Sequence, residues 1–170
     1  GYICGENNET PWSTDEWENY KKYIKEVDCL IIGRKTYEVM KRANEFEILG
    51  FPQILVISKT MNEKKLSIFH TPSDALRYAK EKKYKKIIVG GGAILNTDIL
   101  NAKLATHIHI DIEPVLLGRG KRLFDSHDNK DRVRLMDVKN YPSGTISLDY
   151  EISVNSVSSV VKNKKESNNA

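Results

Sequence analysis

The chain has 170 residues, of which 39% are hydrophobic, 29% charged and 8% aromatic. This length predicts one domain that can bury a core without a metal or disulfide staple. No apolar run approaches the roughly 20 residues of a membrane-spanning helix, and the first residues lack the basic start and apolar core of a signal peptide. Cys4 and Cys29 are too few for a secreted disulfide scaffold, so we expect a cytoplasmic protein.

The charge balance is mildly basic, with 27 Lys and Arg against 23 Asp and Glu and a net charge of +4. The lysines are scattered along the chain, so we expect neither nucleic acid nor membrane as a partner. Residues 156–170 are rich in Lys, Ser and Asn and too poor in apolar residues to order themselves. We therefore predict one domain over residues 1–155 and a disordered tail over 156–170. This tail would be the binding segment if the protein were a nucleic-acid binder.

Apolar runs and helical periods alternate along the chain. Residues 2–4 are a possible short strand, and Ser13 with Glu16 forms a capping box that predicts a helix start. The elements expected after this helix are strands at 29–32, 54–57, 66–69 and 87–89, helices at 34–42, from 71 and at 93–101, a strand at 106–112, and a hairpin of strands 132–139 and 145–154. This order predicts an α/β fold whose sheet has mixed strand directions.

Three of the predicted strands end in residues suited to hold phosphate. These segments are Gly33-Arg34-Lys35-Thr36, Ser58-Lys59-Thr60 and Gly90-Gly91-Gly92. Glycines let a backbone approach a pyrophosphate closely, and the free N–H groups of a helix start favour an anion. Arg34, Lys35 and Lys59 supply more positive charge than a diphosphate needs. The excess would suit an additional 2′-phosphate, which predicts NADP(H) rather than NAD(H).

Each of these segments taken alone is also typical of an ordinary tight turn. A Walker loop is excluded because neither Gly33-Arg34-Lys35-Thr36 nor the segment 118–121 has its spacing. A Rossmann fingerprint beginning at Gly90 would need glycine where the chain has Leu95, although Asp111 lies at a suitable distance for a ribose contact. The prediction therefore depends on the three segments occurring together.

The segments 33–38, 89–93 and 114–120, with Leu123-Phe124, resemble the dihydrofolate-reductase-like superfamily. The resemblance is greatest to the riboflavin-biosynthesis reductase, the reductase domain of a bifunctional deaminase–reductase, and covers residues 1 to about 154. It implies a three-layer α/β fold with a mixed, mostly parallel sheet, helices on both faces and a C-terminal antiparallel hairpin. It also implies a first strand that begins before Gly1 and is truncated here, and it suggests a homodimer.

The resemblance implies NADPH as cofactor and a small heterocycle as substrate. The implied cofactor-binding residues are Gly33, Arg34, Lys35, Thr36, Gly90, Gly91, Gly92, Ala93, Ile94 and Leu95 for the phosphates, and Ser58, Lys59 and Thr60 for the 2′-phosphate end. The implied activity is that of a 5-amino-6-(5-phosphoribosylamino)uracil reductase. Dihydrofolate reductase is the alternative enzyme, and a non-catalytic NADPH-binding regulatory module is the alternative of another class.

Pro11-Trp12 matches the pair that precedes the substrate-side helix of folate reductases, which implies that Trp12 binds substrate. The position that carries the carboxylate in those enzymes is Trp17 here, a departure that argues against folate reduction. Asp15 and Glu16 are adjacent, and either is a candidate catalytic proton donor, although acidic residues in a first helical turn also simply complement the helix dipole. We expect Trp17 and Tyr20 to be core residues.

The pattern His107-x-His109-x-Asp111 places three polar side chains on one face of a strand. Such a set can bind a metal ion, but it is more typical of the polar face of a half-buried strand. We therefore expect no metal.

Overall fold

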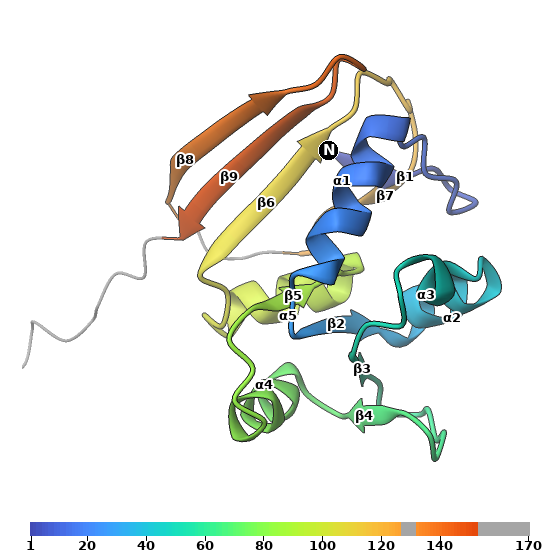
Figure 1. The fold of residues 1–170 in the computed structure, drawn as a ribbon, viewed down its shortest axis with the longest axis vertical. Coiled ribbons are helices and arrows are strands. Elements are labelled where there is room, and N and C mark those ends of the chain that lie inside the picture. The colour runs from blue at the N-terminus through green and yellow to red at the C-terminus, as the bar shows by residue number, and fades with distance from the viewer. Residues whose placement is uncertain (127–131, 153–170) are drawn as a thin grey trace, which may run out of the picture.

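The computed structural model of the chain describes residues 1–126 and 132–152 and divides their strands among three sheets (Figure 1). The four-stranded sheet is parallel, the three-stranded sheet is antiparallel, and two short strands pair separately. The resemblance implied one mixed sheet; among the described residues the parallel and antiparallel strands form separate sheets. The predicted tail at 156–170 and the domain boundary at 155 lie outside the described residues.

The parallel sheet has the strand order β4-β3-β2-β5. Its strands are β2 (Cys29–Gly33), β3 (Ile54–Ile57), β4 (Ser67–Phe69) and β5 (Ile87–Val89). Both faces are covered, which explains why the central strands are continuous apolar runs. The side chains of Leu30, Ile31 and Ile32 on β2 are all 0% exposed.

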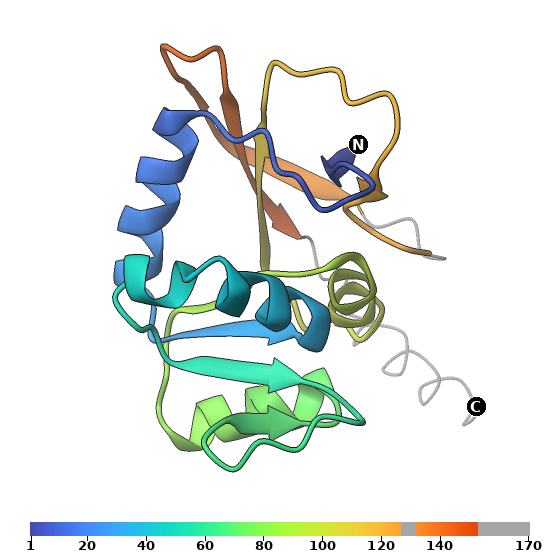
Figure 2. The same ribbon diagram turned by 90° about the vertical axis from the view of Figure 1, so that its right-hand side faces the viewer.

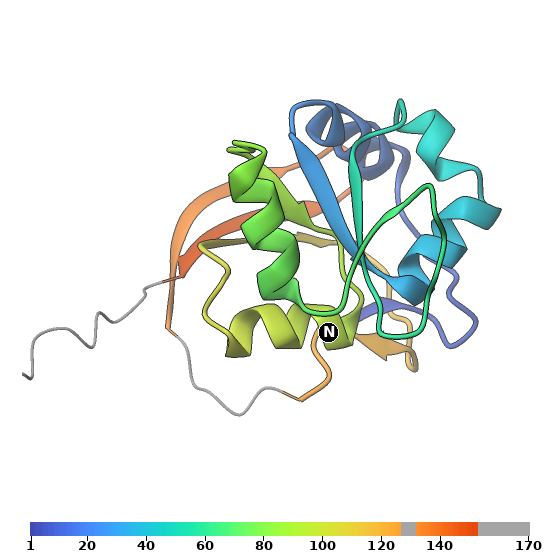
Figure 3. The same ribbon diagram turned by 90° about the horizontal axis from the view of Figure 1, so that it is seen from below.

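Helices cover both faces of the parallel sheet. They are α1 (Thr14–Lys25), α2 (Arg34–Arg42), α3 (Glu45–Ile48), α4 (Pro72–Glu81) and α5 (Ala93–Asn101). Figure 3 shows α4 and α5 on one side of the strands and α2 with α3 on the other. One core therefore joins Ile32 to Met40 of α2, and the second joins Ile31 to Ala75 of α4. No described helix is long and apolar enough to cross a bilayer.

The antiparallel sheet has the order β6-β9-β8. Its strands are β6 (His107–Ile112), β8 (Val133–Asn140) and β9 (Ile146–Ile152). The predicted hairpin between β8 and β9 is confirmed: the Gly144 N–H donates to the Tyr141 carbonyl over 2.9 Å, and Gly144 has φ +88°. Figure 2 shows α1 along one side of this sheet, which brings the start of α1 close to β6 and the hairpin turn.

The possible strand at the start of the chain is confirmed as β1 (Tyr2–Cys4), which pairs with β7 (Lys121–Arg122). A Cβ at Gly120 would collide with the Cys4 carbonyl oxygen, so glycine is required where these strands meet. The sequence did not predict β7 or the short helix α3, because two and four residues are too few to show a period.

Candidate functional site

The three predicted phosphate-binding segments lie side by side at one edge of the parallel sheet. Gly33 pairs with Ile57, the residue before Ser58, in the ladder of β2 and β3. On the other side of β2, the Gly33 N–H donates to the carbonyl of Gly91 over 2.9 Å. The structure therefore gathers at one place segments that are far apart in the sequence.

Two helices begin at this edge without a side-chain cap. The N-caps of α2 and α5 are Gly33 and Gly92, and neither helix has an acidic residue in its first turn. By contrast, Ser13 and Thr71 cap α1 and α4, and both of those helices carry acidic residues there. In α2 and α5, therefore, neither a capping side chain nor an acidic residue offsets the positive end of the helix dipole. The first backbone N–H groups of these helices are suited to bind an anionic ligand.

The glycines of this edge differ in what they do for the fold. A Cβ at Gly33 would lie 3.7 Å from the Gly91 carbonyl oxygen, and one at Gly92 would lie 3.6 Å from Thr36 Oγ1, both ordinary contacts. Neither residue has positive φ, so the fold itself does not require glycine at either position. A Cβ at Gly90, however, would lie 2.9 Å from Leu30 Cδ1, so packing explains that glycine. The lack of a side chain at Gly33 and Gly92 would let a ligand approach the backbone closely.

The side chains at this edge fall into exposed cations and structural groups. Lys35 and Lys59 are exposed, and Arg34 is held by Glu38, Nη1 to Oε1 over 2.7 Å. Ser58 is buried, and its Oγ accepts the N–H groups of Thr60 and Met61 over 3.2 and 2.9 Å. Ser58 thus holds the turn that presents Lys59 and Thr60.

In α5, the predicted residues Ala93, Ile94 and Leu95 offer different groups. The Leu95 side chain is 4% exposed and belongs to the core, which leaves its backbone N–H as the group available at the helix start. Ile94 is 65% exposed. Contact between this helix start and a phosphate would therefore depend on the backbone.

A second polar region forms where the start of α1 meets the antiparallel sheet. The N–H and the hydroxyl of Ser13 donate to Glu113 Oε1 over 2.9 and 3.0 Å, and the Thr145 hydroxyl donates to Glu113 Oε2 over 2.9 Å. Thr145 is completely buried. This Ser13–Glu113–Thr145 network fixes the first turn of α1 against the end of β6. Sequence reasoning missed Glu113 and Thr145 because they are 100 and 132 residues from Ser13.

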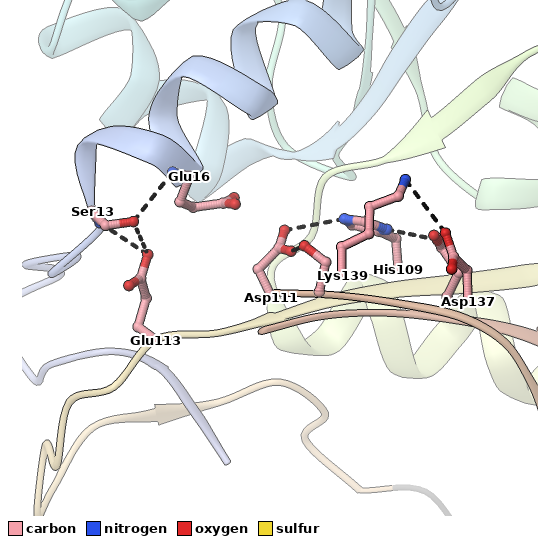
Figure 4. Close-up of polar contacts among 9 residues, drawn as sticks. Ser13, Glu16, His109, Asp111, Glu113, Asp137 and Lys139 are labelled. Carbon is pink, nitrogen blue, oxygen red and sulfur yellow. Dashed lines mark hydrogen bonds and ion pairs between the residues drawn. The ribbon is translucent and has the colours of Figure 1, made fainter. Parts of the chain in front are cut away.

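The structure separates the two predicted catalytic acids. Asp15 turns to the β8–β9 hairpin, where its Oδ2 accepts the N–H of Ser143 over 3.1 Å. Glu16 is only 8% exposed, and its side chain extends toward Asp111 on β6 (Figure 4). Of the two candidates, Glu16 is therefore the buried acid.

The surroundings of Glu16 favour its protonated form. Burial, followed by the negative charge of Asp111 and the hydrogen bond to it, raises the pKa of Glu16 to about 8. Burial alone would also raise the pKa of Asp111, but hydrogen bonds from His109, Ser147 and Glu16 lower it. The opposite shifts of the two pKa values favour a protonated Glu16 beside an ionised Asp111 at neutral pH.

His109 completes this cluster on β6. Its Nε2 lies 3.2 Å from Asp111 Oδ2 and its Nδ1 lies 2.6 Å from Asp149 Oδ1. The hydrogen bond to Asp111 raises the pKa of His109 to about 9 against the opposing effect of burial, and Asp149 adds to the rise. The Tyr23 ring of α1 stacks on the imidazole with centroids 5.8 Å apart. The predicted polar strand face thus lies against α1, and the described residues hold no cluster of three side chains suited to a metal ion.

An aromatic cluster lies at the start of α1. The ring centroid of Trp12 is 5.5 Å from that of Trp17 and 5.6 Å from that of Tyr20. Trp17 and Tyr20 pack on the core around Ile32, which confirms their prediction as core residues. Trp12 is 40% exposed, so it presents an aromatic surface just before the helix that carries Glu16.

Comparison with known protein families shows to which family the chain belongs. Residues 39–147, more than half of the chain, match the model of the RibD C-terminal domain. The chain belongs to the RibD C-terminal domain family. This is a reductase domain of riboflavin biosynthesis, and RibD-like reductases generally depend on pyridine nucleotides. The resemblance inferred from the sequence motifs is confirmed.

The RibD-like chain has relatives in Bacillus subtilis (strain 168). YyaP is 25% identical over 165 residues, which cover 88% of each chain. YwjB is 26% identical over 156 residues, which cover 83% of this chain and 86% of the relative.

Solved structures share the fold. A putative riboflavin biosynthesis protein from Shewanella sp. PV-4 has a TM-score of 0.70 at 18% identity, with 89% of this chain and 92% of that chain covered. The Thermotoga maritima diaminohydroxyphosphoribosylaminopyrimidine deaminase/5-amino-6-(5-phosphoribosylamino)uracil reductase has a TM-score of 0.68 at 11% identity. That comparison covers 89% of this chain and 53% of the T. maritima chain, so the RibD-like chain corresponds to about half of the larger protein. The α/β fold class predicted from the sequence is confirmed.

Proposed function

We propose that the chain is an NADPH-dependent reductase of a pyrimidine- or pterin-type heterocycle, with a substrate like 5-amino-6-(5-phosphoribosylamino)uracil. The family supports a reductase. The observation that carries the proposal is the buried, protonated Glu16 at the start of α1. A cytoplasmic location remains a prediction from the sequence.

The edge of the parallel sheet suits the cofactor. The backbone N–H groups at the starts of α2 and α5 would hold the diphosphate, with Gly33 and Gly92 allowing close approach. Lys59 and Thr60, on the turn after β3, would contact the 2′-phosphate, and Lys35 and Arg34 add positive charge. When bound, NADPH supplies the hydride of the reduction.

The reduction also consumes a proton, and Glu16 supplies it. Its Oε–H bond breaks as the proton passes to the substrate, which leaves a carboxylate beside the ionised Asp111. Two adjacent carboxylates repel each other, so Glu16 recovers a proton readily. The protonated His109, hydrogen-bonded to Asp111, is a source for it, and His109 is exposed enough for solvent to restore its own proton.

Trp12 is suited to stack on the heterocycle. It is half-exposed and is supported from behind by Trp17 and Tyr20. The Ser13–Glu113–Thr145 network fixes the residue next to Trp12, so the aromatic surface and the acid are held within one helical turn of each other.

NADPH absorbance, followed with 5-amino-6-(5-phosphoribosylamino)uracil and separately with dihydrofolate, tests the proposal. We expect oxidation with the pyrimidine, and oxidation with dihydrofolate alone would instead identify a dihydrofolate reductase. Saturable NADPH binding without turnover of either compound would indicate a non-catalytic nucleotide-binding module. Absence of NADPH binding would refute the cofactor site itself.

A further inference from the structure

The antiparallel sheet carries titratable side chains on the face that meets α1. Strand register places His109 of β6 opposite Asp149 of β9, and Asp149 opposite Asp137 of β8. Asp111 lies two residues beyond His109 and therefore on the same face. The Tyr23 ring of α1 stacks on His109, so this face is turned to the helix. The apolar side chains of β6 and β9 alternate with the polar ones and point away from α1.

His109 is held between two carboxylates. Its Nδ1 lies 2.6 Å from Asp149 Oδ1, and its Nε2 lies 3.2 Å from Asp111 Oδ2. A flip of the ring would turn carbon atoms toward both oxygens, so the two acids fix its orientation. The contact with Asp149 is the shorter one, and Asp111 also accepts the hydroxyl of Ser147. A neutral imidazole would therefore keep its proton on Nδ1, which makes Nε2 the nitrogen that loses and regains a proton.

Asp111 connects this imidazole to the buried Glu16. The carboxylate of Asp111 faces His109 on one side, and the Glu16 side chain extends toward it from α1 (Figure 4). Solvent exposure rises along the series: Glu16 is buried, the Asp111 side chain is 17% exposed and the His109 side chain is 38% exposed. This order is the one that a path for protons from solvent to a buried acid requires.

The contact between His109 and Asp149 also has a purely structural explanation. Opposite charges often pair across neighbouring strands, and an exposed pair contributes little to stability. That explanation does not account for the second contact of His109, with the carboxylate beside the buried acid. The place of the pair at the solvent end of this series favours a role in proton supply.

We propose that Asp149 is a positioning residue for the reduction: it fixes the His109 imidazole so that Nε2 returns a proton through Asp111 to Glu16 after each turnover. This role of Asp149 rests on the proposed function, in which Glu16 gives its proton to the substrate. The Nε2–H bond of the imidazolium breaks as its proton moves to Asp111, and a proton moves from Asp111 to the Glu16 carboxylate. The imidazole is left neutral, with its Nδ1–H on Asp149. Water at the exposed ring restores the Nε2 proton, so each turnover consumes one proton from solvent.

Asp137 provides the matched control for Asp149. It is a carboxylate in the same row of the sheet, but it forms an ion pair with Lys139, Oδ2 to Nζ over 3.5 Å. The other charged or titratable side chains around His109 are Glu16 and Tyr23 of α1, Lys86, whose Nζ lies 4.4 Å from the centre of the Tyr23 ring, and Glu151 in the next row of β9. The variants below leave these groups unchanged.

Stopped-flow measurement of NADPH oxidation separates the first turnover from the later ones. In Asp149→Ala, Glu16 is still protonated at the start, so the first turnover should keep its native rate. Later turnovers should be at least about tenfold slower, because the imidazole is no longer held with Nε2 toward Asp111. The expected signature is a burst of one NADPH per site, with little change in KM. Asp137→Ala should behave like the native chain.

His109→Ala removes the proton carrier itself. This variant should show the same burst, and added imidazole should restore at least part of its later turnovers. A readout without substrate or cofactor comes from ¹⁵N NMR of the histidine rings. Neutral His109 should carry its proton on Nδ1 in the native chain and in Asp137→Ala, and Asp149→Ala should lose this preference.

The outcomes distinguish the proposed function from the role of Asp149. A native chain that oxidises NADPH with neither heterocycle overturns the proposed function and this role with it. A native chain that turns over, beside an Asp149→Ala variant with native later turnovers or an unchanged Nδ1 preference, overturns the role of Asp149 alone. Circular dichroism melts establish that the variants are folded. If Asp149→Ala does not fold, the same measurements on Asp149→Asn, which keeps the shape but removes the charge, decide the matter.

Discussion

The side chain of Glu16, on α1, is buried beside the carboxylate of Asp111, on β6, and the negative charge of that carboxylate adds to burial in raising the pKa of Glu16. Two carboxyl groups in such contact do not both ionise at neutral pH. The less hydrated Glu16 keeps the proton, and Asp111 remains charged because His109 and Ser147 donate to it. The protonated Glu16 is therefore a potential proton donor at the start of α1, close in sequence to Trp12.

Replacement of Glu16 by Gln tests this acid directly. Glutamine keeps the shape and can still donate to Asp111, but it has no acidic proton to give. We expect NADPH binding to persist while kcat falls about 100- to 1000-fold, the usual contribution of general acid catalysis. Glu18→Gln, an exposed acid on the same helix, should change kcat less than about threefold. Equal losses in both variants would contradict the assignment.

The pH dependence of the reduction follows from the state of Glu16. Only the protonated acid donates, so kcat should be highest below its pKa of about 8 and should fall as the pH rises through it. Asp111→Asn removes the neighbouring charge that raises this pKa, so the fall should move to lower pH. Initial rates between pH 6 and 10 measure both profiles, and identical profiles would exclude Asp111 as the group that tunes Glu16.

Stability should decrease between about pH 6.5 and pH 9. The folded pKa of His109, about 9, exceeds its ordinary value of 6.5, so the folded state binds this proton more tightly. The stabilisation is fully present below pH 6.5 and is lost as the pH rises through 9. Urea unfolding of the native chain and of His109→Gln measures it: the variant should lose part of this pH dependence. His70→Gln, at an exposed histidine, should keep all of it.

The cations beside the proposed phosphate-binding edge should set the choice between NADPH and NADH. Lys59→Ala is expected to raise the KM for NADPH about tenfold and to leave the KM for NADH nearly unchanged, because only NADPH carries the 2′-phosphate. Arg34→Ala should show a smaller effect in the same direction, since Glu38 already engages its guanidinium. Lys82→Ala, an exposed lysine that follows α4, is the control. A preference that both variants leave unchanged would refute the phosphate assignment.

The Ser13–Glu113–Thr145 network should contribute to stability. Thr145→Val keeps the shape of a fully buried side chain but removes the hydroxyl that donates to Glu113. The free energy of unfolding should fall by about 1–3 kcal/mol, because a carboxylate oxygen loses its partner. Urea titration measures the change, and Thr14→Val, at an exposed position beside the same helix start, should have little effect. A neutral Thr145→Val would mean that the network does not hold α1 in place.

Much of the fold was predictable because the relevant signals are local. The structure has α2 and α5 at the predicted residues 34–42 and 93–101, since a glycine precedes each apolar period and marks its start. The buried strands followed from short apolar runs, and the convergence of Gly33 with Gly91 followed from the rule that parallel strands end at the same edge. The capping hydrogen bond of Ser13 to the Glu16 N–H was predicted in the same way.

The sequence by itself thus determined the α/β class, the family and the positions of the described elements other than α3 and β7, and it predicted an edge that suits a nucleotide. Only the tertiary structure distinguished Glu16 from Asp15, gave Asp111 its role as the partner of a buried acid, and brought Glu113 and Thr145 to the start of α1. It also decided that the polar face of β6-β9-β8 meets α1 and the apolar face does not. Helix caps and strand periods arise between near neighbours in the chain, so the sequence shows them directly. The burial and the pKa of Glu16 depend on residues about a hundred positions away, and only the packing of α1 on the sheet brings those residues together.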